Sequence, residues 1–352
     1  MKAWYKKYER WLMPVTLTLG FVADYVTFVS IQINTALILL YVYWVLAALT
    51  MSFIYAYDNG KFSLRFRNVR LFAPLLIQFT FGGLLSNSFI FYWFSGSVWV
   101  SWPFVLAFVL LMVSNDALRE YFFRPTIQLT VYFFASFSII SVTLPFVFNS
   151  LNPVWFVLSG FLGLILVVLF LAFARAIAGP VKFNPKNFGV ASMVILLALN
   201  FLYFRNLIPP VPLAVREAGA YHSIARKGGE YELKAENESF FDKLLFGQTL
   251  NVTEWERVYV FSSIFAPKDL NTPIIHEWQY NSPASGWTVK DRLSFNLTGG
   301  RQAGFRGYSY KTHLSEGEWR VYIKTERGQT LGRVKFKINK TDTLPPLKEI
   351  TK

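Results

Sequence analysis

The sequence predicts a membrane protein with a polytopic α-helical bundle, followed by an exported antiparallel β-sandwich with an Ig-like layout. Two observations carry this prediction. Long apolar segments with short charged connections fill the first 210 residues, whereas the rest alternates apolar and polar residues. A cluster of prolines at 209–212 marks the change, because proline cannot continue a helix. We therefore expect a transmembrane domain over 1–210, an exported domain over 211–345 and a tail over 346–352.

Seven segments are long and apolar enough to cross a membrane, since about 20 apolar residues span the roughly 30 Å hydrocarbon core. The first segment is not a cleavable signal peptide, because its apolar stretch is too long and no small-residue cleavage site follows it. We expect it to remain in the protein. The seven predicted spans run approximately over 11–32, 35–57, 71–94, 97–114, 126–148, 153–174 and 188–207.

Lysine and arginine occupy alternate connections between these segments. The N-terminus and the second, fourth and sixth connections hold 13 of them, whereas the first, third and fifth, IQIN, SGSV and NSLN, hold none. The positive-inside rule places basic connections in the cytoplasm. The sequence therefore predicts a cytoplasmic N-terminus and, after seven spans, a C-terminal domain on the other side of the membrane.

Composition and motifs exclude several function classes. Most of the net charge of +14 lies in the first 210 residues, where topology explains it, so we expect no nucleic-acid partner. Without cysteine the chain has no disulfide and no thiolate site. It contains no G-x-S-x-G elbow, P-loop or dinucleotide fingerprint, and His222, His276 and His313 lack metal-ligand spacing. The sequence therefore lacks a motif for soluble-enzyme chemistry, and we expect no cofactor and no metal site.

Polar and ionisable residues inside the predicted spans would indicate a site for transport or catalysis. Asp24 is the one acidic residue there. One interpretation is that its carboxylate is hydrogen-bonded to neighbouring helices or lies near the membrane interface. The other is that it forms a proton or cation site. Gln128 and Ser136 suggest interhelical hydrogen bonds, and the pair Gly160 and Gly163 suggests close helix packing.

The second half contains strands with a period of two. Segment 318–324, EWRVYIK, places Trp319, Val321 and Ile323 on one face, and 331–338, LGRVKFKI, exposes its basic residues and buries its apolar ones. The turn ERGQ between them predicts a terminal hairpin. Further strands are predicted at 220–225, 230–236, 257–265, 273–280 and 288–297.

The segment GGRQAGFRGYSYK, residues 299–311, is the most site-like stretch. Its glycines would let a partner approach the backbone, its basic residues suit carboxylate or phosphate, and its tyrosines could stack on a sugar. The alternative is that the glycines form turns or bulges beside a solvated face. The candidate partner-binding residues are Arg301, Arg306, Tyr308 and Lys311, joined by His276 and Trp278 of the strand 273–280, although such a face is more often sandwich core than a carbohydrate platform.

Three segments of the second half are similar to a known protein family. They are YHSIARKGGEYEL at 221–233, VYVFSSIFAPKDLNTPIIHEWQY at 258–280, and the stretch from 299 to 338. They resemble the bacterial family called domain of unknown function 2914. The whole chain is similar to bacterial proteins that join it to a multi-spanning domain of unknown function numbered 5924. The resemblance implies a multi-pass inner-membrane protein with a periplasmic sandwich, and it brings no activity or catalytic residue.

Two function classes follow from these observations. In the first, the protein is a non-enzymatic accessory component of the envelope whose exported domain binds a periplasmic or membrane protein, or a cell-envelope glycan or lipid. In the second, the helical bundle is a transporter or membrane enzyme for a lipid-linked or small substrate. The scarcity of charge inside the spans favours the first class. Membrane lipids are expected partners in both.

Overall fold

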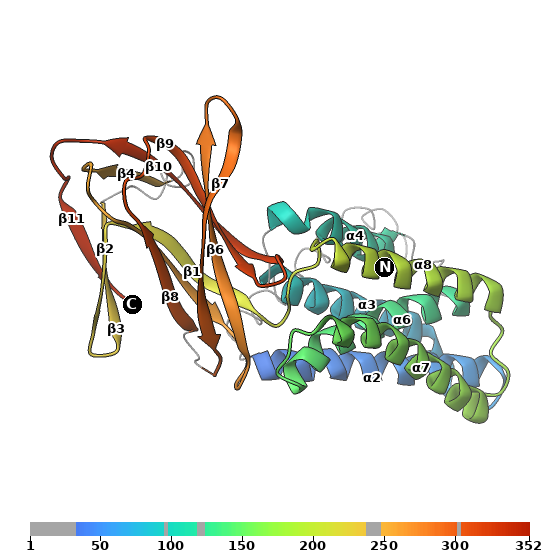
Figure 1. Ribbon diagram of the computed structural model, residues 1–352. Coiled ribbons are helices and arrows are strands. Elements are labelled where there is room, and N and C mark those ends of the chain that lie inside the picture. The colour runs from blue at the N-terminus through green and yellow to red at the C-terminus, as the bar shows by residue number, and fades with distance from the viewer. Residues whose placement is uncertain (1–32, 95–97, 118–123, 237–247, 301–303) are drawn as a thin grey trace, which may run out of the picture. The chain divides into compact units, whose positions relative to one another are not determined.

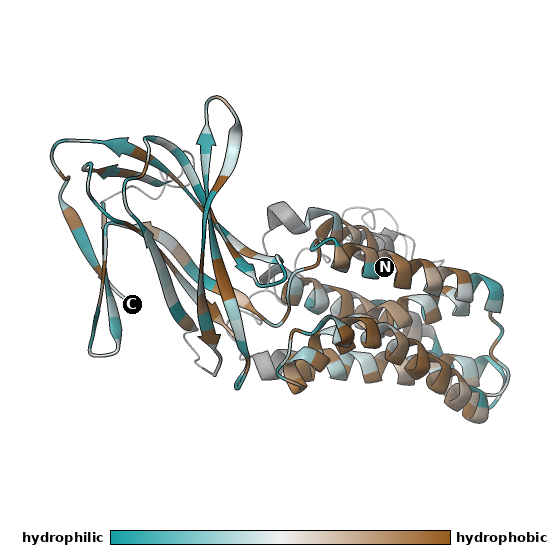
Figure 2. Cartoon of the chain, viewed as in Figure 1, coloured by the Kyte–Doolittle hydropathy of each residue, from teal (hydrophilic) through white to brown (hydrophobic). Residues whose placement is uncertain are grey.

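A computed structural model describes residues 33–94, 98–117, 124–236, 248–300 and 304–352. The chain forms two compact units, one helical and one strand-rich (Figure 1). The helices are mostly hydrophobic, whereas the strands mix hydrophobic and hydrophilic residues, as Figure 2 shows. An apolar helical region followed by a strand-rich region was the coarse prediction from the sequence, and the structure confirms it.

The helical unit contains six described α-helices. Their bounds are α2 Ile33–Asp58, α3 Arg67–Phe94, α4 Val98–Ala117, α6 Pro125–Val147, α7 Pro153–Ala178 and α8 Pro185–Phe204, with a 3-10 turn at Leu64–Phe66. Within the described residues, five helices are long and apolar enough to cross a membrane: Leu37–Asp58, Leu64–Trp93, Pro125–Val147, Pro153–Ala178 and Pro185–Phe204.

Two of the seven predicted spans differ from these five. The predicted span 11–32, with Asp24, lies outside the described residues. The predicted span 97–114 corresponds to α4, of which Ser101–Leu111 is a shorter apolar helix within the described residues and is not among the five. The number of seven spans therefore stays a prediction.

Proline and asparagine fix where three helices begin. Pro125, Pro153 and Pro185 occupy the first turns of α6, α7 and α8, where the missing N–H costs nothing. The side-chain oxygen of Asn152 accepts a hydrogen bond from the backbone N–H of Val154 at 2.9 Å, which caps α7.

Helix α6 is at the centre of the packing, with α2, α7 and α8 against it. As predicted, Gln128 and Ser136 join helices: the Tyr55 hydroxyl donates to Gln128 Oε1 at 2.8 Å, and Trp44 Nε1 donates to Ser136 Oγ at 2.8 Å. A Cβ on Gly163 would lie 3.1 Å from the backbone nitrogen of Phe137, so this glycine lets α6 and α7 approach closely.

The strand-rich unit contains eleven described strands in three sheets, ordered β1-β5-β8, β4-β10-β9-β6-β7 and β11-β3-β2. The first six strands are β1 Ala214–Tyr221, β2 Ser223–Lys227, β3 Glu230–Glu236, β4 Gln248–Val252, β5 Val258–Phe265 and β6 Asn271–Ser282. The other five are β7 Gly286–Thr298, β8 Phe305–Lys311, β9 Gly317–Thr325, β10 Thr330–Lys340 and β11 Leu347–Thr351.

The three sheets form layers, with β1-β5-β8 in the middle. Its inner side packs against the five-stranded sheet through buried residues such as Val260, Trp278 and Phe336. Its other side packs against the small sheet β11-β3-β2 through Phe261 and Leu233. Alternation along β5 sends neighbouring residues to opposite layers, which explains why that strand is buried on both faces.

The predicted hairpin is present. Strand β9 pairs antiparallel with β10, and Val321 stands opposite Val334. Trp319, Val321 and Ile323 are buried, as the sequence pattern indicated. The expectation of an antiparallel fold throughout is wrong at one place, because β4 runs parallel to β10. A short strand such as β4 carries no signal for its direction in its own sequence.

Candidate binding surface

Strand β8 forms most of the segment that the sequence singled out. Its alternation sends Gly307, Ser309 and Lys311 toward the five-stranded sheet, and Arg306, Tyr308 and Tyr310 to the other side. Tyr308 is 42% exposed and Tyr310 is 47% exposed. Because β8 is an edge strand and the small sheet covers only the part of this side near Phe261, the two tyrosines reach solvent.

Aromatic rings continue from these tyrosines across the middle sheet. Tyr259 of β5 stands opposite Tyr310, with ring centroids 5.5 Å apart, and its ring is 6.0 Å from that of Tyr308. Tyr231 of β3 meets Tyr308 edge-on at 6.3 Å. These distances are typical of aromatic pairs that hold one another in place. The exposed rings therefore form one surface rather than separate side chains.

Two arginines border the rings. The guanidinium carbon of Arg257 lies 5.1 Å from the ring centroid of Tyr310, a cation–π distance. Arg306 Nη1 donates to the backbone oxygen of Gly229 at 3.5 Å, which places it beside the β2–β3 turn. We call this surface the tyrosine face and define it as Arg257, Tyr259, Arg306, Tyr308 and Tyr310.

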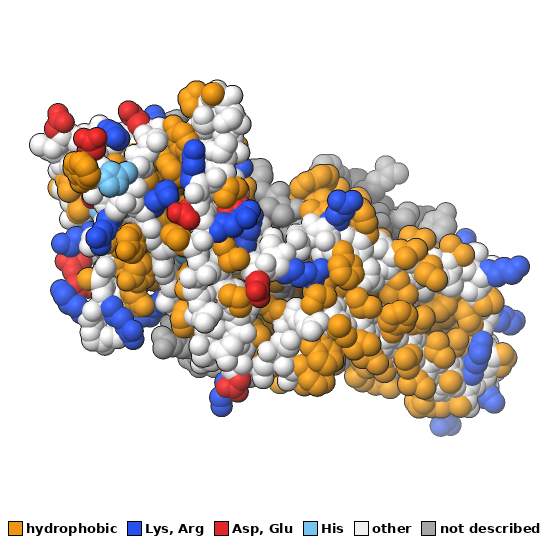
Figure 3. Space-filling view, viewed as in Figure 1, with side chains coloured by type: hydrophobic (Ala, Val, Ile, Leu, Met, Phe, Trp, Pro, Cys, Tyr) orange, Lys and Arg blue, Asp and Glu red, His pale blue; other side chains and the backbone are white. Residues whose placement is uncertain are grey.

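Beyond the end of the β5–β8 pair, one more aromatic residue is exposed. Trp255 is 74% exposed and meets the ring of His313 edge-on at 4.7 Å. In Figure 3, hydrophobic side chains, lysines or arginines and a histidine lie along one side of the strand-rich unit. Such a mixture of apolar rings and fixed cations at a surface is typical of recognition sites.

The sequence-predicted residues do not all join this surface. Lys311 points to the opposite side of β8, where Nζ donates to Asp291 Oδ2 at 3.0 Å, and this hydrogen bond lowers the pKa of the Asp291 carboxyl. Arg301 lies outside the described residues. Arg257, Tyr259 and Trp255 were missed, because only the pairing of β5 with β8 brings them next to the singled-out segment.

The glycines of the segment have packing roles. A Cβ on Gly307 would lie 2.2 Å from the Phe295 ring, so the glycine lets β7 approach. Gly304 has a φ of +86° and lies against Ser263 and Ile264. The alternative interpretation of the sequence, that glycines serve the fold, agrees with this geometry, whereas the bordering arginines and tyrosines are not explained by it.

His276 and Trp278 lie in the core instead of on a surface. Both are fully buried, so a partner has no access to them. The ring nitrogens of His276 lie 3.0 Å from Ser262 Oγ and 2.8 Å from Ser309 Oγ, and Trp278 Nε1 donates to Ser309 Oγ at 3.0 Å. Burial lowers the pKa of His276 to about 4, so the imidazole is neutral at pH 7.

A second buried histidine is held by carboxylates. Nδ1 of His222 lies 2.7 Å from Glu256 Oε1, and Nε2 lies 2.9 Å from Glu236 Oε1. Glu236 also accepts hydrogen bonds from the backbone and side chain of Asn251. Among the described residues, no group of histidines and acids has a geometry that could hold a metal ion.

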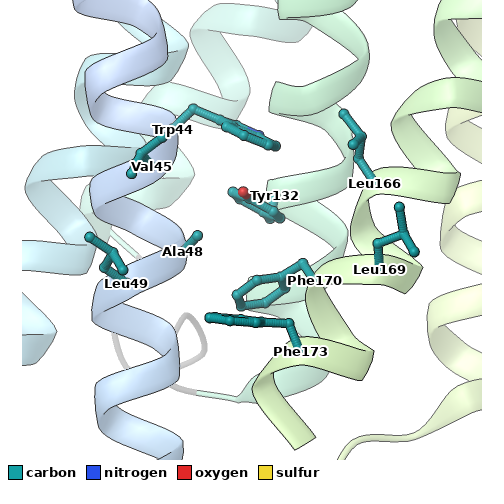
Figure 4. A pocket seen from close by; sticks show the side chains of 9 residues that line it. All are labelled: Trp44, Val45, Ala48, Leu49, Tyr132, Leu166, Leu169, Phe170 and Phe173. Carbon is teal, nitrogen blue, oxygen red and sulfur yellow. The ribbon is translucent and has the colours of Figure 1, made fainter. Parts of the chain in front are cut away.

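The helical unit has a pocket of about 300 Å³ among α2, α6 and α7. Aromatic and aliphatic side chains line it, as Figure 4 shows, and none of them is ionisable except Tyr132. Asp24 lies outside the described residues, so the pocket does not test its role. The lining residues are Trp44, Val45, Ala48, Leu49, Tyr132, Leu166, Leu169, Phe170 and Phe173.

The strand-rich unit is similar to a known family over part of its length. Residues 271–338 match the family described as "Protein of unknown function (DUF2914)". The DUF2914 segment runs from β6 to most of β10, and it includes Arg306, Tyr308 and Tyr310. The predicted resemblance of the C-terminal part is thereby confirmed. No curated protein matches the sequence.

Solved structures give only distant similarities. Two structures of a β-glucosidase from Listeria innocua, with glucose and with isofagomine, are 13% and 12% identical, with TM-scores of 0.18 and 0.19. They align with 26% and 36% of this chain, and the chain spans only 15% and 16% of their length. The alkylpurine DNA glycosylase AlkC from Pseudomonas fluorescens, bound to DNA containing an abasic site analog, is 9% identical over 84% of this chain and 97% of its own, with a TM-score of 0.23. These scores are too low to indicate a shared fold.

Proposed function

We propose that the protein is a non-enzymatic component of a bacterial inner membrane whose strand-rich unit lies in the periplasm and binds a cell-envelope glycan at the tyrosine face. In this proposal seven helices cross the membrane, the N-terminus is cytoplasmic, and the sheets form an Ig-like sandwich. The resemblance of the first half to the family numbered 5924 belongs to the same proposal.

Contacts between helix connections support the orientation. Asn59, between α2 and α3, donates through Nδ2 to the backbone oxygens of Ala178, the last residue of α7, and of Pro180, between α7 and α8, at 2.8 and 3.0 Å. The basic residues of both connections, among them Lys61 and Lys182, are therefore at the same end of the helical unit. Figure 3 shows lysines and arginines gathered at one end of it. A cytoplasmic location of that end follows the positive-inside rule.

The tyrosine face is the observation that carries the glycan proposal. Sugar rings present C–H groups with a slight positive charge, which match the negative face of an aromatic ring. Tyr308 and Tyr310 offer such rings in fixed positions, and Arg257 and Arg306 beside them suit the carboxylates of acidic sugars and peptides. We therefore expect an anionic glycan rather than a neutral one.

Binding of soluble peptidoglycan fragments tests the proposal. The full-length protein, purified in mild detergent, is titrated with anionic disaccharide-peptides and with a neutral maltooligosaccharide, and the dissociation constants are measured by calorimetry. We expect binding of the anionic fragments only. The double variant Tyr308→Ala/Tyr310→Ala should bind at least about tenfold more weakly, since each lost aromatic contact costs about 1 kcal/mol.

Tyr322→Ala is the matched control, because Tyr322 occupies a comparable strand position on the outer side of the five-stranded sheet. It should leave the dissociation constant unchanged. Circular dichroism and thermal unfolding establish that all variants are folded. Equal binding by the wild type and the folded double variant would contradict the proposed role of the tyrosine face.

A further inference from the structure

The outer side of the five-stranded sheet is rich in basic residues. On β9 and β10 the inward residues, such as Val321 and Phe336, are buried in the core, so alternation sends the intervening residues outward. Cross-strand neighbours share a side, and β6 and β7 extend the same surface. We call this surface the basic face and define it as Arg292, Arg320, Lys324, Arg333, Lys335 and Lys337, with the carboxylates Glu277 and Glu318 among them.

A buried carboxylate holds part of the basic face in place. Glu277 is buried and accepts hydrogen bonds from Lys324 Nζ at 2.6 Å and Arg292 Nε at 2.9 Å. Gln279 Nε2 donates to it at 2.7 Å. Burial alone raises the pKa of Glu277, but these hydrogen bonds outweigh it, so its pKa lies below the usual value. Glu277 is therefore ionised at neutral pH and fixes both cations.

Arg320 is oriented by the same network. Its Nε donates to Gln279 Oε1 at 2.8 Å, and its guanidinium lies 3.9 Å from the ring centroid of Trp287. Within the described part of the chain, its two Nη groups make no hydrogen bond. The side chain is thus fixed with donors left over. A fixed planar guanidinium with free donors is the arrangement that binds phosphate in a bidentate manner.

The charges of the basic face do not balance one another. Lys335 stands directly opposite Arg320 in the β9–β10 pair, and like charges in that position destabilise a sheet. Oε1 of Glu318 lies 3.5 Å from Nζ of Lys335, whereas Glu277 forms ion pairs with Lys324 and Arg292. A surface shaped for solubility would mix the two signs more evenly. The excess of positive charge indicates an anionic partner.

The short connection between α8 and β1 indicates which anionic partner the basic face binds. Helix α8, apolar enough to cross a membrane, ends at Phe204, and β1 begins at Ala214. The extended chain between them reaches at most about 35 Å, so the bilayer stays at a high effective concentration near the strand-rich unit. Each basic residue near an anionic leaflet contributes about 1 kcal/mol. A broad array of cations on a sheet fits a lipid surface better than a narrow groove would.

We propose that the basic face docks on the surface of the bilayer by binding the phosphate groups of anionic phospholipids. Docking holds the strand-rich unit in one orientation at the membrane and leaves the tyrosine face, on another side of the unit, accessible to its own partner. This proposal does not depend on the glycan proposal, because different residues carry the two.

The absence of cysteine makes a labelling test clean, since an introduced cysteine is the only thiol. Ser294→Cys places it on the outer side of β7 beside the basic face, and Ala225→Cys places it on the small sheet, where Ala225 is exposed. The full-length variants are reconstituted in nanodiscs of phosphatidylcholine with or without phosphatidylglycerol. We expect phosphatidylglycerol to slow the maleimide reaction at least about threefold at Ser294→Cys and to leave Ala225→Cys unchanged.

Neutralising variants show whether charge causes the protection. Arg320→Gln/Lys335→Gln, in the Ser294→Cys background, should abolish the slowing, whereas Lys227→Gln/Lys234→Gln on the small sheet should preserve it. Equal reaction rates in both lipid compositions would overturn the proposal. So would slowing by soluble polyphosphate in phosphatidylcholine nanodiscs without any effect of phosphatidylglycerol, since the basic face would then bind a soluble polyanion.

Discussion

Nδ1 of His276 and the hydroxyl oxygen of Ser309 lie 2.8 Å apart in the core between the middle sheet and the five-stranded sheet. Ser262 satisfies the other ring nitrogen. An imidazole next to a serine suggests a hydrolase pair, but a nucleophile must reach a substrate. Since His276 is fully buried and its pKa is low, the arrangement is a neutral polar network that fixes the packing of β5, β6 and β8.

This network predicts a pH dependence of stability. Burial lowers the pKa of His276 from 6.5 to about 4, so the unfolded chain binds the proton more tightly than the folded one. Stability is therefore fully present above about pH 6.5 and is lost as the pH falls toward 4, by about 3 kcal/mol in total. Urea unfolding of the full-length protein in detergent, followed by near-UV circular dichroism between pH 4 and 8, measures it.

His276→Gln is the informative variant for that prediction. It keeps a polar group between the serines but removes the titration. We expect a lower stability at pH 8 and a much weaker loss between pH 6.5 and 4. If the variant and the wild type lose the same stability over this range, other groups cause the acid sensitivity.

Because His222 lies between two carboxylates, we expect a large loss of stability when its imidazole is removed. His222→Ala would leave Glu236 and Glu256 close together and mostly buried without the group between them. Removing their shared hydrogen-bond partner leaves buried carboxylate oxygens unsatisfied, which costs about 3 kcal/mol. Urea unfolding in detergent gives the change in the free energy of unfolding.

A second substitution tests the cause of that loss. Glu256→Gln, added to His222→Ala, removes one of the two charges and should restore part of the stability, although the single variant Glu256→Gln destabilises the wild type. Additive losses in the double variant would show that packing, not charge, explains the effect of His222→Ala.

Topology is tested with reporter fusions. We expect a reporter that is active only outside the cytoplasm to be active after Lys352 and silent in the connection 58–70. The reason is the basic residues gathered in that connection, such as Arg65 and Arg67. The opposite pattern would invert the proposed orientation and place the tyrosine face in the cytoplasm.

The parts of the fold that the sequence predicted are those with strong local periodicity. The hairpin β9–β10 was predicted with its buried face because apolar and charged residues alternate strictly there. Strand β8 was not predicted, since Gly304 precedes it directly and Gly307 interrupts its pattern. The predicted tail, 346–352, contains β11, which pairs with β3 through a stretch with only Leu347 and Ile350 as apolar residues.

The candidate surface was predicted only in part for a related reason. Arg306 and Tyr308 lie in the singled-out segment, whereas Arg257, directly before β5, and Tyr259 of β5 lie about 50 residues earlier. Only the β5–β8 pairing brings them together. The cluster of His222, Glu236 and Glu256 also joins residues that are distant in the sequence, since its hydrogen bonds link positions 14 and 34 residues apart. No local pattern shows that the end of β3 and the connections β1–β2 and β4–β5 bring these side chains together.

Gly307 and Phe295 give the last prediction, which separates packing from binding within β8. A Cβ on Gly307 would lie 2.2 Å from Cε2 of Phe295, a distance that no packed core accepts. Gly307→Ala must therefore displace the ring or the strand, and we expect it to destabilise the protein by about 2 kcal/mol. Phe295→Ala costs stability through a cavity, yet it provides the space that the added methyl group needs. The double variant should then be more stable than the sum of the two losses, by about 1 kcal/mol or more, because the residues touch. Additive losses, measured by urea unfolding in detergent, would show that Gly307 is required for the backbone of β8 rather than for its contact with Phe295.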